Sequence, residues 1–247
     1  ESHYVSANNA ARIMLINNRR VTMISQGISH TAYDVMREYM IIGAELDGKY
    51  QIPMLDRYTG HPGEDTVDFK DSFSPKIKNH RKLTVNFYIH DYEFEKIWNN
   101  PDRYLEHLKC FHSVIGPDFS MAVGENGMPF AMNIYQKYRN HALSHYLSMN
   151  GIKVIPNVSI PPEYCYDWAF DGVPKRSTVA CCTNGRIKSR ASREEFCIGF
   201  KEMERRIEPL RVIVVGKIPP ELNTDVDIIN FNTRSQKIKD KEGKYGV

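Results

Sequence analysis

The fold is decided by six short apolar runs, which read LTVNFYIHD (83–91), SVIGPDFS (113–120), IKVIPNVS (152–159), STVACCTNG (177–185), RVIVVG (211–216) and VDIINFN (226–232). Each run is rich in Val and Ile and ends in polar or glycine residues, a pattern typical of fully buried strands. The segments between the runs are long enough to cross over a sheet, and the clearest have helical periodicity. Parallel strands need such crossovers, so the alternation predicts a parallel sheet covered by helices.

The runs follow one another with no sign of a reversal in strand order. We therefore expect an α/β fold of the TIM-barrel type, in which repeated βα units form a mostly parallel sheet that is closed or nearly closed. The alternative is an open, doubly wound sheet, with helices on both faces and the first strand at the centre. In both folds the ligand site lies beyond the carboxyl ends of the strands.

A chain of 247 residues is long enough for one α/β domain of this kind. We expect that domain over residues 31–233, after an N-terminal segment of uncertain order (1–30) and before a charged, mobile tail (234–247). Within the domain, a helix is predicted from Thr31 to about Leu46, where Asp47-Gly48 ends it.

Two further segments precede the six runs. QIPMLDR (51–57) is predicted to be a first short strand, and positions 57–80 read as an extended loop with a brief strand piece, VDF. The basic run PKIKNHRK (75–82) closes that loop.

Composition excludes some classes of protein. A net charge of +3 is too small to indicate a nucleic-acid partner by itself, and no apolar window is long enough for a membrane helix. The five cysteines form no C-x-x-C pair. Cys181 and Cys182 lie inside an apolar strand, where we expect buried, unpaired thiols, and a reducing cytoplasm is the compartment that fits best.

Several spaced motifs resemble one known family. They are FYIHDYEFEKIW (87–98), PDRYLEHL (101–108), GPDFS (116–120), IYQKYRNHAL (134–143), GIKVIPNVS (151–159), FDGVPKRSTVACCTNG (170–185) and RVIVVG (211–216). Together they look like the domain of unknown function 4417 family over roughly residues 31–232. The resemblance implies a protein of a phage, prophage or mobile element in a bacterial host, and it implies no activity. The family tends to have two acidic residues where this chain has His90-Asp91.

Two carboxylates at strand ends are the first candidates for chemistry. Asp118 follows Pro117 at the end of an apolar run, and Ser120 lies two residues on, so both side chains would point the same way from an extended strand. Asp118 is either a ligand-facing carboxylate or a cap for the loop that follows. Asp91 is either its partner in acid–base chemistry or the N-cap of the helix through Trp98.

Polar groups at other strand ends would bind the ligand. Thr183, Gly185 and Arg186 follow one strand and offer a hydroxyl, backbone N–H groups and positive charge, as phosphate sites do, although an ordinary βα turn also explains them. Asn157 ends another strand, and no established nucleotide-binding motif is present.

The longest predicted helix, about 128–149, contributes one more candidate ligand-binding residue, Arg139. His141 and His145 stand at i, i+4, which fits either a metal pair or a surface pair, and we expect a surface pair because no third ligand has convincing spacing. We expect the apolar side chains of this helix to form core, namely those of Tyr135, Tyr138, Tyr146 and Leu147.

Two functions fit these patterns. The first is a pocket at the strand carboxyl ends that binds a phosphate-bearing ligand, a nucleotide or a nucleic-acid end, with hydrolysis as one reaction and a divalent metal as one cofactor. The second is a non-catalytic accessory or counter-defence protein that binds a host protein or DNA. It would use one basic face formed by PKIKNHRK (75–82), RIKSR (186–190) and Arg205-Arg206.

Overall fold

A computed structural model of the protein describes residues 37–124 and 127–245, so the segment 1–30 and the first residues of the helix expected from Thr31 lie outside the described part. The chain divides into two compact units, residues 1–45 and 46–247. In the first unit a 3-10 helix, η2, spans Glu38–Ile41. The helix expected up to Leu46 does not continue, because Gly43 has a φ of 79° and Leu46 begins a strand.

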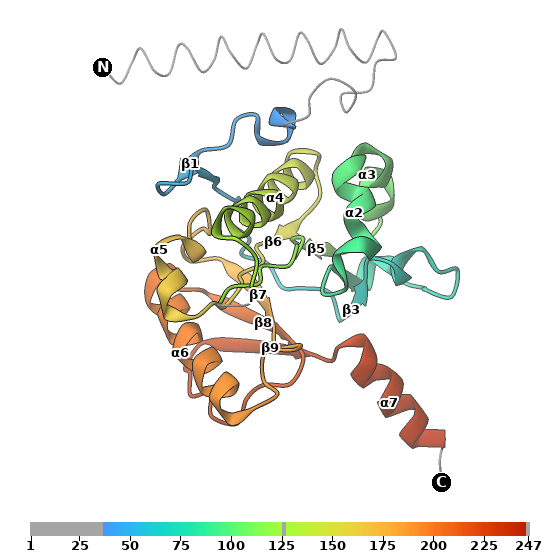
Figure 1. Cartoon of the computed structure of the whole chain (residues 1–247). Helices are drawn as coiled ribbons and strands as arrows, with labels where there is room; N and C mark the ends of the chain where they lie inside the picture. The colour runs from blue at the N-terminus through green and yellow to red at the C-terminus, as the bar shows by residue number, and fades with distance from the viewer. Residues whose placement is uncertain (1–36, 125–126, 246–247) are drawn as a thin grey trace, which may run out of the picture. The chain divides into compact units, whose positions relative to one another are not determined.

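The second unit contains two parallel sheets whose strand order follows the chain (Figure 1). The first sheet comprises β3 (Asp65–Asp68), β4 (Leu83–Asn86), β5 (Ser113–Ile115) and β6 (Val154–Ile155). The second comprises β7 (Thr178–Cys182), β8 (Arg211–Val215) and β9 (Asp227–Phe231). One parallel bridge, between Asn157 and Ala180, joins the sheets where β6 meets β7.

The six apolar runs therefore supply six of the seven parallel strands. The seventh strand lies in a segment that was predicted to be mostly loop. It is β3, which includes part of the piece read as a brief strand within a loop. QIPMLDR contains a short strand as predicted, β2 (Ile52–Pro53), but this strand pairs antiparallel with β1 (Leu46–Asp47) and stands outside the parallel sheets.

The expected closed barrel is not found among the described residues, because the edge strands β3 and β9 are not hydrogen-bonded to each other. The strand order also differs from that of a doubly wound sheet, since no reversal occurs. A helix, α7 (Arg234–Tyr245), connects the two edges instead: Lys237 Nζ lies 2.5 Å from Asp65 Oδ1 and Arg234 Nε 2.6 Å from Asp71 Oδ2. This helix occupies the segment expected to be a mobile tail.

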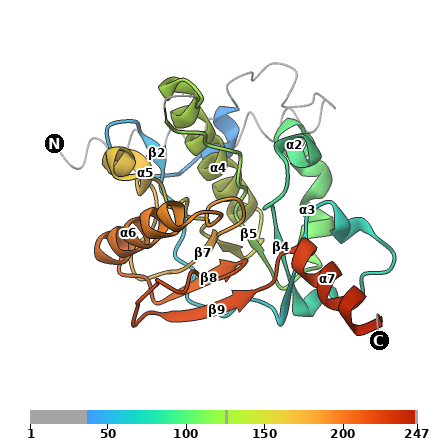
Figure 2. The same ribbon diagram turned by 60° about the horizontal axis from the view of Figure 1, so that its bottom comes forward.

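The crossover segments form the helices α2 (Asp91–Asn99), α3 (Asp102–Lys109), α4 (Phe130–Met149), α5 (Tyr166–Ala169) and α6 (Arg190–Ile207), with short 3-10 turns η3 (Asp71–Phe73), η4 (His80–Lys82) and η5 (Glu163–Cys165). Right-handed crossovers between strands in sequence order place helices on the same face of a sheet. Figure 2 shows α6 beside β7 and β8. Phe196, Phe200 and Met203 of α6 accordingly share one buried apolar cluster with Val179 and Val212.

The opposite face of the sheets carries a second, smaller apolar cluster. Ile115, Ile155, Ala180 and Ile213 are buried there, and Tyr58 and Tyr88 pack against them.

No helix among the described residues is both long and apolar enough to cross a membrane.

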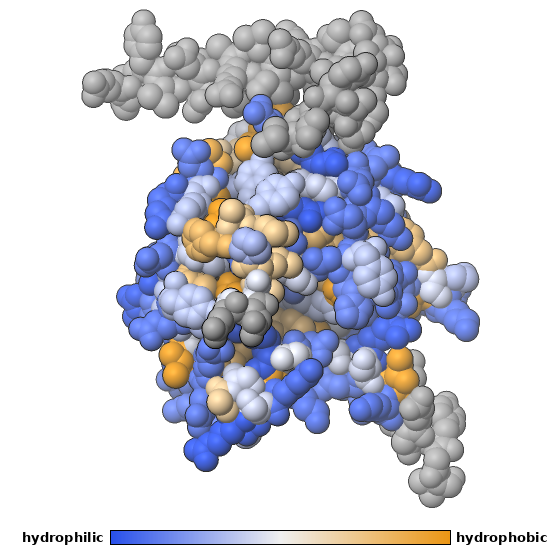
Figure 3. Space-filling model, viewed as in Figure 1, coloured by the Kyte–Doolittle hydropathy of each residue, from blue (hydrophilic) through white to orange (hydrophobic). Residues whose placement is uncertain are grey.

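Helix α4 buries polar side chains and exposes apolar ones. Tyr146 and Leu147 are buried as expected, but Tyr135 is 51% exposed, and so the expectation that it forms core was wrong. Figure 3 shows hydrophobic residues gathered over the start of α4, where Phe130 and Met132 are also exposed. The buried polar residues of this helix are Asn133, Gln136, Lys137, Arg139, Asn140, His141, Ser144 and His145.

Candidate functional site

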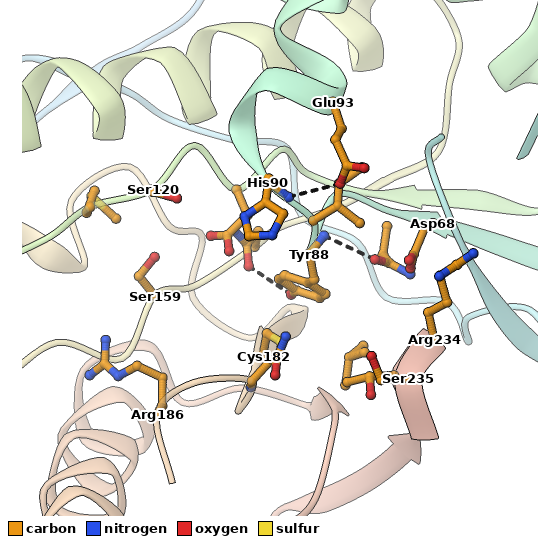
Figure 4. Close-up of a pocket in the computed structure, with 18 of the residues that line it drawn as sticks. Asp68, Tyr88, His90, Glu93, Ser120, Ser159, Cys182, Arg186, Arg234 and Ser235 are labelled. Atoms are coloured by element: carbon orange, nitrogen blue, oxygen red, sulfur yellow. Dashed lines mark hydrogen bonds between the residues drawn. The ribbon is translucent and has the colours of Figure 1, made fainter. Parts of the chain in front are cut away.

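A cavity of about 460 Å³ opens at the carboxyl ends of the parallel strands (Figure 4). Each of the seven strands, or the loop that directly follows it, contributes to the wall. The contributing residues, in strand order, are Asp68, Asn86, Asp118, Asn157, Cys182, Val215 and Thr233. The sequence thus predicted the position of the pocket correctly, because parallel strands bring their carboxyl ends to one edge.

Asp118 is the final acceptor in a short hydrogen-bond chain within this pocket. Asn157 Nδ2 donates to Asp118 Oδ1 at 2.8 Å, and the hydroxyl of Tyr88 donates to Asn157 Oδ1 at 2.9 Å. Burial raises the pKa of Asp118 to about 6, against the opposing effect of the Asn157 hydrogen bond. Asp118 can therefore take up or release a proton near neutral pH.

Tyr88 fixes the orientation of the Asn157 amide. Burial raises the pKa of Tyr88 well above its ordinary value, and the nearby Asp118 carboxylate raises it further. The phenol therefore remains a hydrogen-bond donor, and it occupies the amide oxygen of Asn157, which leaves the Nδ2 group facing Asp118.

Asp91 supports the Asp118 loop and does not line the pocket. It is the first residue of α2, whose N-cap is His90, in a capping box with Glu93. The Asp91 carboxylate accepts hydrogen bonds from Ser120 N at 3.1 Å and Ser120 Oγ at 2.8 Å. Asp91 thus lies beside the pocket wall, where its charge also raises the pKa of Asp118, while Ser120 lines the pocket.

Three lysine and arginine side chains reach the pocket wall, and two of them are paired with carboxylates. Lys70 lies 2.5 Å from Glu93, and Arg234 is paired with Asp71. Arg186 makes no ion pair among the described residues and donates to the carbonyl oxygen of Ile160. Figure 4 places Arg186 and Arg234 on opposite sides of the pocket, so Arg186 is the cation there that can meet an anionic ligand.

Two of the expected ligand-binding residues lie beside the pocket without lining it. Thr183 is buried, its amide donates to Val215 O at 3.1 Å, and its Oγ1 has no hydrogen-bond partner within the described part of the chain. Gly185 is exposed in the turn after β7 with a φ of 77°. The neighbouring Asn184 and Arg186 supply the pocket contacts instead.

Arg139 was predicted to bind ligand, and the structure places it in the scaffold. Its side chain is 9% exposed and its Nη2 lies 2.6 Å from the Glu95 carboxylate. The guanidinium carbon lies 3.6 Å from the ring centre of Phe119 and 4.9 Å from that of Trp98. Arg139 therefore joins α4 to α2 and holds the Phe119 side chain next to Asp118.

Several pocket residues were missed, for two different reasons. Asp68 and Asn86 are the last residues of β3 and β4, so the strand-end argument could have found them. Burial raises the pKa of Asp68 as well. Arg234 and Ser235 enter the pocket from α7, and no local pattern in the sequence indicates that position.

The described residues contain no group of three or more His, Cys, Asp or Glu side chains that could hold a metal ion. His141, of the possible histidine pair, is buried, with its Nδ1 2.9 Å from the carbonyl oxygen of Pro53, and burial lowers its pKa well below the ordinary value. It is therefore a neutral, packed histidine.

We expect native Cys181 and Cys182 to react slowly with a thiol reagent such as Ellman's reagent. Burial raises the pKa of both thiols, that of Cys182 to about 12, and the thiolate is the reactive form. Cys110, which is exposed, should react first. Peptide mapping after brief labelling would show the order, and fast labelling of Cys182 would contradict the expectation.

Comparison with known proteins gives a family and two relatives. The model of the family described as "Domain of unknown function (DUF4417)" matches residues 44–232. The chain is 32% identical over 134 residues to the "Gene 1 protein" of Mycobacterium phage L5, covering 54% of this chain and 57% of that protein. It is 29% identical to the "Gene 1 protein" of Mycobacterium phage D29 over 54% of this chain and 48% of that protein. The chain thus spans about half the length of these relatives, and no solved structure matches it.

Proposed function

Because this chain belongs to the domain of unknown function 4417 family, which has relatives in phages, we propose its function from its own pocket: binding of a phosphate-bearing ligand, a nucleotide or a nucleic-acid end, with Asp118 as general acid or base. One observation supports this proposal most. Asp118, with its pKa of about 6, and Arg186, with no carboxylate partner among the described residues, line the same cavity. A general acid or base works best with a pKa near the working pH.

The positions of their charges give Arg186 and Asp118 different roles in this proposal. Arg186 would bind the phosphate, because a guanidinium presents several N–H donors in a geometry that matches phosphate oxygens. Asp118 would exchange a proton with the reacting group, while Asn157 holds its carboxyl in place. Hydrolysis is one reaction that such a pair can perform, with a proton passing between Asp118 and water or the leaving oxygen.

A thermal-shift screen would test the proposal. We expect a nucleotide, pyrophosphate or a 5′-phosphorylated oligonucleotide to raise Tm, since a ligand that binds only the folded state stabilises it. Arg186→Ala should remove that rise. Arg190→Ala is the matched control, because Arg190 is exposed on α6 and already paired with Glu194, so the rise should persist.

Two results would count against the proposal. The first is that none of these phosphate compounds shifts Tm at millimolar concentration. The second is that the ligand-induced rise is the same in Arg186→Ala as in the unsubstituted protein.

The alternative is a non-catalytic accessory or counter-defence protein that binds a host protein or DNA through one basic face, and the positions of its three basic segments favour it less. Residues 75–82 precede β4, whereas Arg186 lies in the pocket beyond the opposite ends of the strands. Arg205 and Arg206 are both paired with Glu202 on α6. The three basic segments therefore do not make a single binding face.

A further inference from the structure

A row of basic residues precedes three neighbouring strands at the edge opposite the pocket. Lys82 directly precedes β4, His112 directly precedes β5 and Lys153 directly precedes β6. The pairing of Thr84 with Ser113 and of Val114 with Val154 places these three positions on neighbouring strands, each offset by one residue from the previous one. Arg81, next to Lys82, is exposed like Lys153.

Two surface hollows lie along this row, and Arg81 lines both of them. The smaller, of about 150 Å³, is lined by the basic residues Arg81, Lys109, His112 and Lys153 together with uncharged residues. The larger, of about 410 Å³, is lined by Asn79, His80, Arg81, Lys82 and Cys110. Neither hollow has an acidic residue in its wall.

The charges in this row are only partly neutralised. Lys82 pairs with Glu64 and Lys109 with Glu106, but Arg81 and Lys153 make no ion pair among the described residues. The Lys153 charge also lowers the pKa of His112, in the same direction as the larger effect of burial. This edge therefore keeps a local excess of positive charge in a chain whose net charge is only +3.

We propose that this amino-end row, formed by Arg81, Lys82, His112 and Lys153, binds the phosphodiester backbone of a nucleic acid. Adjacent strands are about 4.8 Å apart, so the row spans roughly 10 Å across three strands. A nucleic-acid strand carries one phosphate per nucleotide whatever its base sequence, so a row of this length can contact consecutive phosphates of one strand. An acidic peptide would match the row only with an unbroken run of carboxylates, and so a nucleic acid is the better fit.

This surface is separate from the phosphate pocket proposed above, because it lies at the other end of the same parallel strands. Its binding should be independent of base sequence, since backbone contacts carry no sequence information directly. It should also weaken steeply with salt, because bound cations are released from the phosphates.

The test is fluorescence anisotropy with a labelled 20-nucleotide single strand and the corresponding duplex, in about 50 mM and 150 mM salt. We expect binding to one or both, and we expect R81E/K153E to weaken it by more than about tenfold. R190E/K201E is the matched control: it makes the same change in net charge at exposed cations of α6, each of which has a carboxylate neighbour. It should weaken binding far less.

The charge-neutralising pair R81Q/K153Q tests whether R81E/K153E weakens binding because contacts with phosphates are lost rather than because negative charges are introduced. It should lower the slope of log affinity against log salt by about 1.4 to 1.8, or about 0.7 to 0.9 per phosphate contact. Each variant is used only if its circular dichroism and Tm match those of the unsubstituted protein. The oligonucleotides used here have no terminal phosphate, so the pocket proposed above, which would bind a phosphorylated end, does not contribute to the measured affinity.

Three outcomes would overturn the proposal. Equal loss in the two charge-reversed pairs would mean that net charge alone drives binding. Complete competition by inorganic phosphate at matched ionic strength would mean that the row binds free anions. Absence of binding at about 50 mM salt would remove the surface as a nucleic-acid site.

Discussion

Replacing Asp118 by Asn should weaken ligand binding by more than about tenfold, equivalent to roughly 1.4 kcal/mol, while leaving the fold intact or more stable. The substitution keeps the shape of the side chain and removes its charge and its ability to exchange a proton. The expected gain in stability arises because burial makes the ionised carboxylate unfavourable in the folded state.

The stability effect should depend on pH in a defined direction. The pKa of Asp118 rises from 3.8 to about 6 on folding. The contribution of the protonated carboxyl to the stability of the folded state is therefore complete below about pH 4 and is lost as the pH rises through about 6. Asn resembles the protonated acid. The Tm of Asp118→Asn should therefore match that of the unsubstituted protein near pH 4 and exceed it by about 2 to 8 °C above pH 7, for about 1 to 2 kcal/mol.

Calorimetry across this pH range and ligand titration would check both parts. Asp225→Asn is the matched control, because Asp225 is exposed and should change neither property. If Asp118→Asn bound ligand normally and Asp118→Ala were clearly less stable, Asp118 would be a structural cap, since Asn caps about as well as Asp.

Arg139→Ala should show the opposite pattern, with a large loss of stability. The change removes the guanidinium between Phe119 and Trp98 and leaves Glu95 without its cation. Losing one partner of a buried ion pair costs about 3 to 5 kcal/mol. Glu95 is 41% exposed, which reduces the expected cost to about 2 to 3 kcal/mol, or a fall in Tm of about 4 to 12 °C.

Urea unfolding would measure that loss directly. Arg103→Ala is the matched control, since Arg103 is exposed on α3 and makes no ion pair within the described part of the protein. Arg139→Lys should recover only part of the stability, because an ammonium group lacks the planar surface that stacks on the two rings. A variant Arg139→Ala as stable as the control would refute the scaffold role.

The order of the strands and the position of the pocket could be predicted from sequence, because both follow from alternating βα units. The runs around Asp118 and Asn157 were thereby placed correctly at one edge. Closure of the sheets into a barrel could not be predicted in this way. It depends on whether β3 and β9 meet, and no residue pattern within either strand encodes that contact.

Helix α4 shows why the role of Arg139 could not be read from sequence. Hydrophobic periodicity assumes that the buried face is apolar, but this helix buries Lys137, Arg139 and His141 and exposes Tyr135. Lys137 Nζ, for example, donates to the carbonyl oxygen of Ala169 at 2.8 Å. Such partners come from distant segments, so only the folded structure shows whether a polar side chain of α4 faces ligand or scaffold.

The way α7 returns to β3 has a consequence for the order of events during synthesis. Each strand pairs with its neighbour in sequence, so the sheets can grow outward as the chain leaves the ribosome. The last part of the pocket wall is synthesised with Thr233, Arg234 and Ser235. Lys237 then anchors it to Asp65 on β3, the first strand of the parallel sheets to be synthesised. A nascent chain that stops before these residues would have the sheets but an unfinished pocket, so ligand binding would begin only when synthesis of this segment is complete.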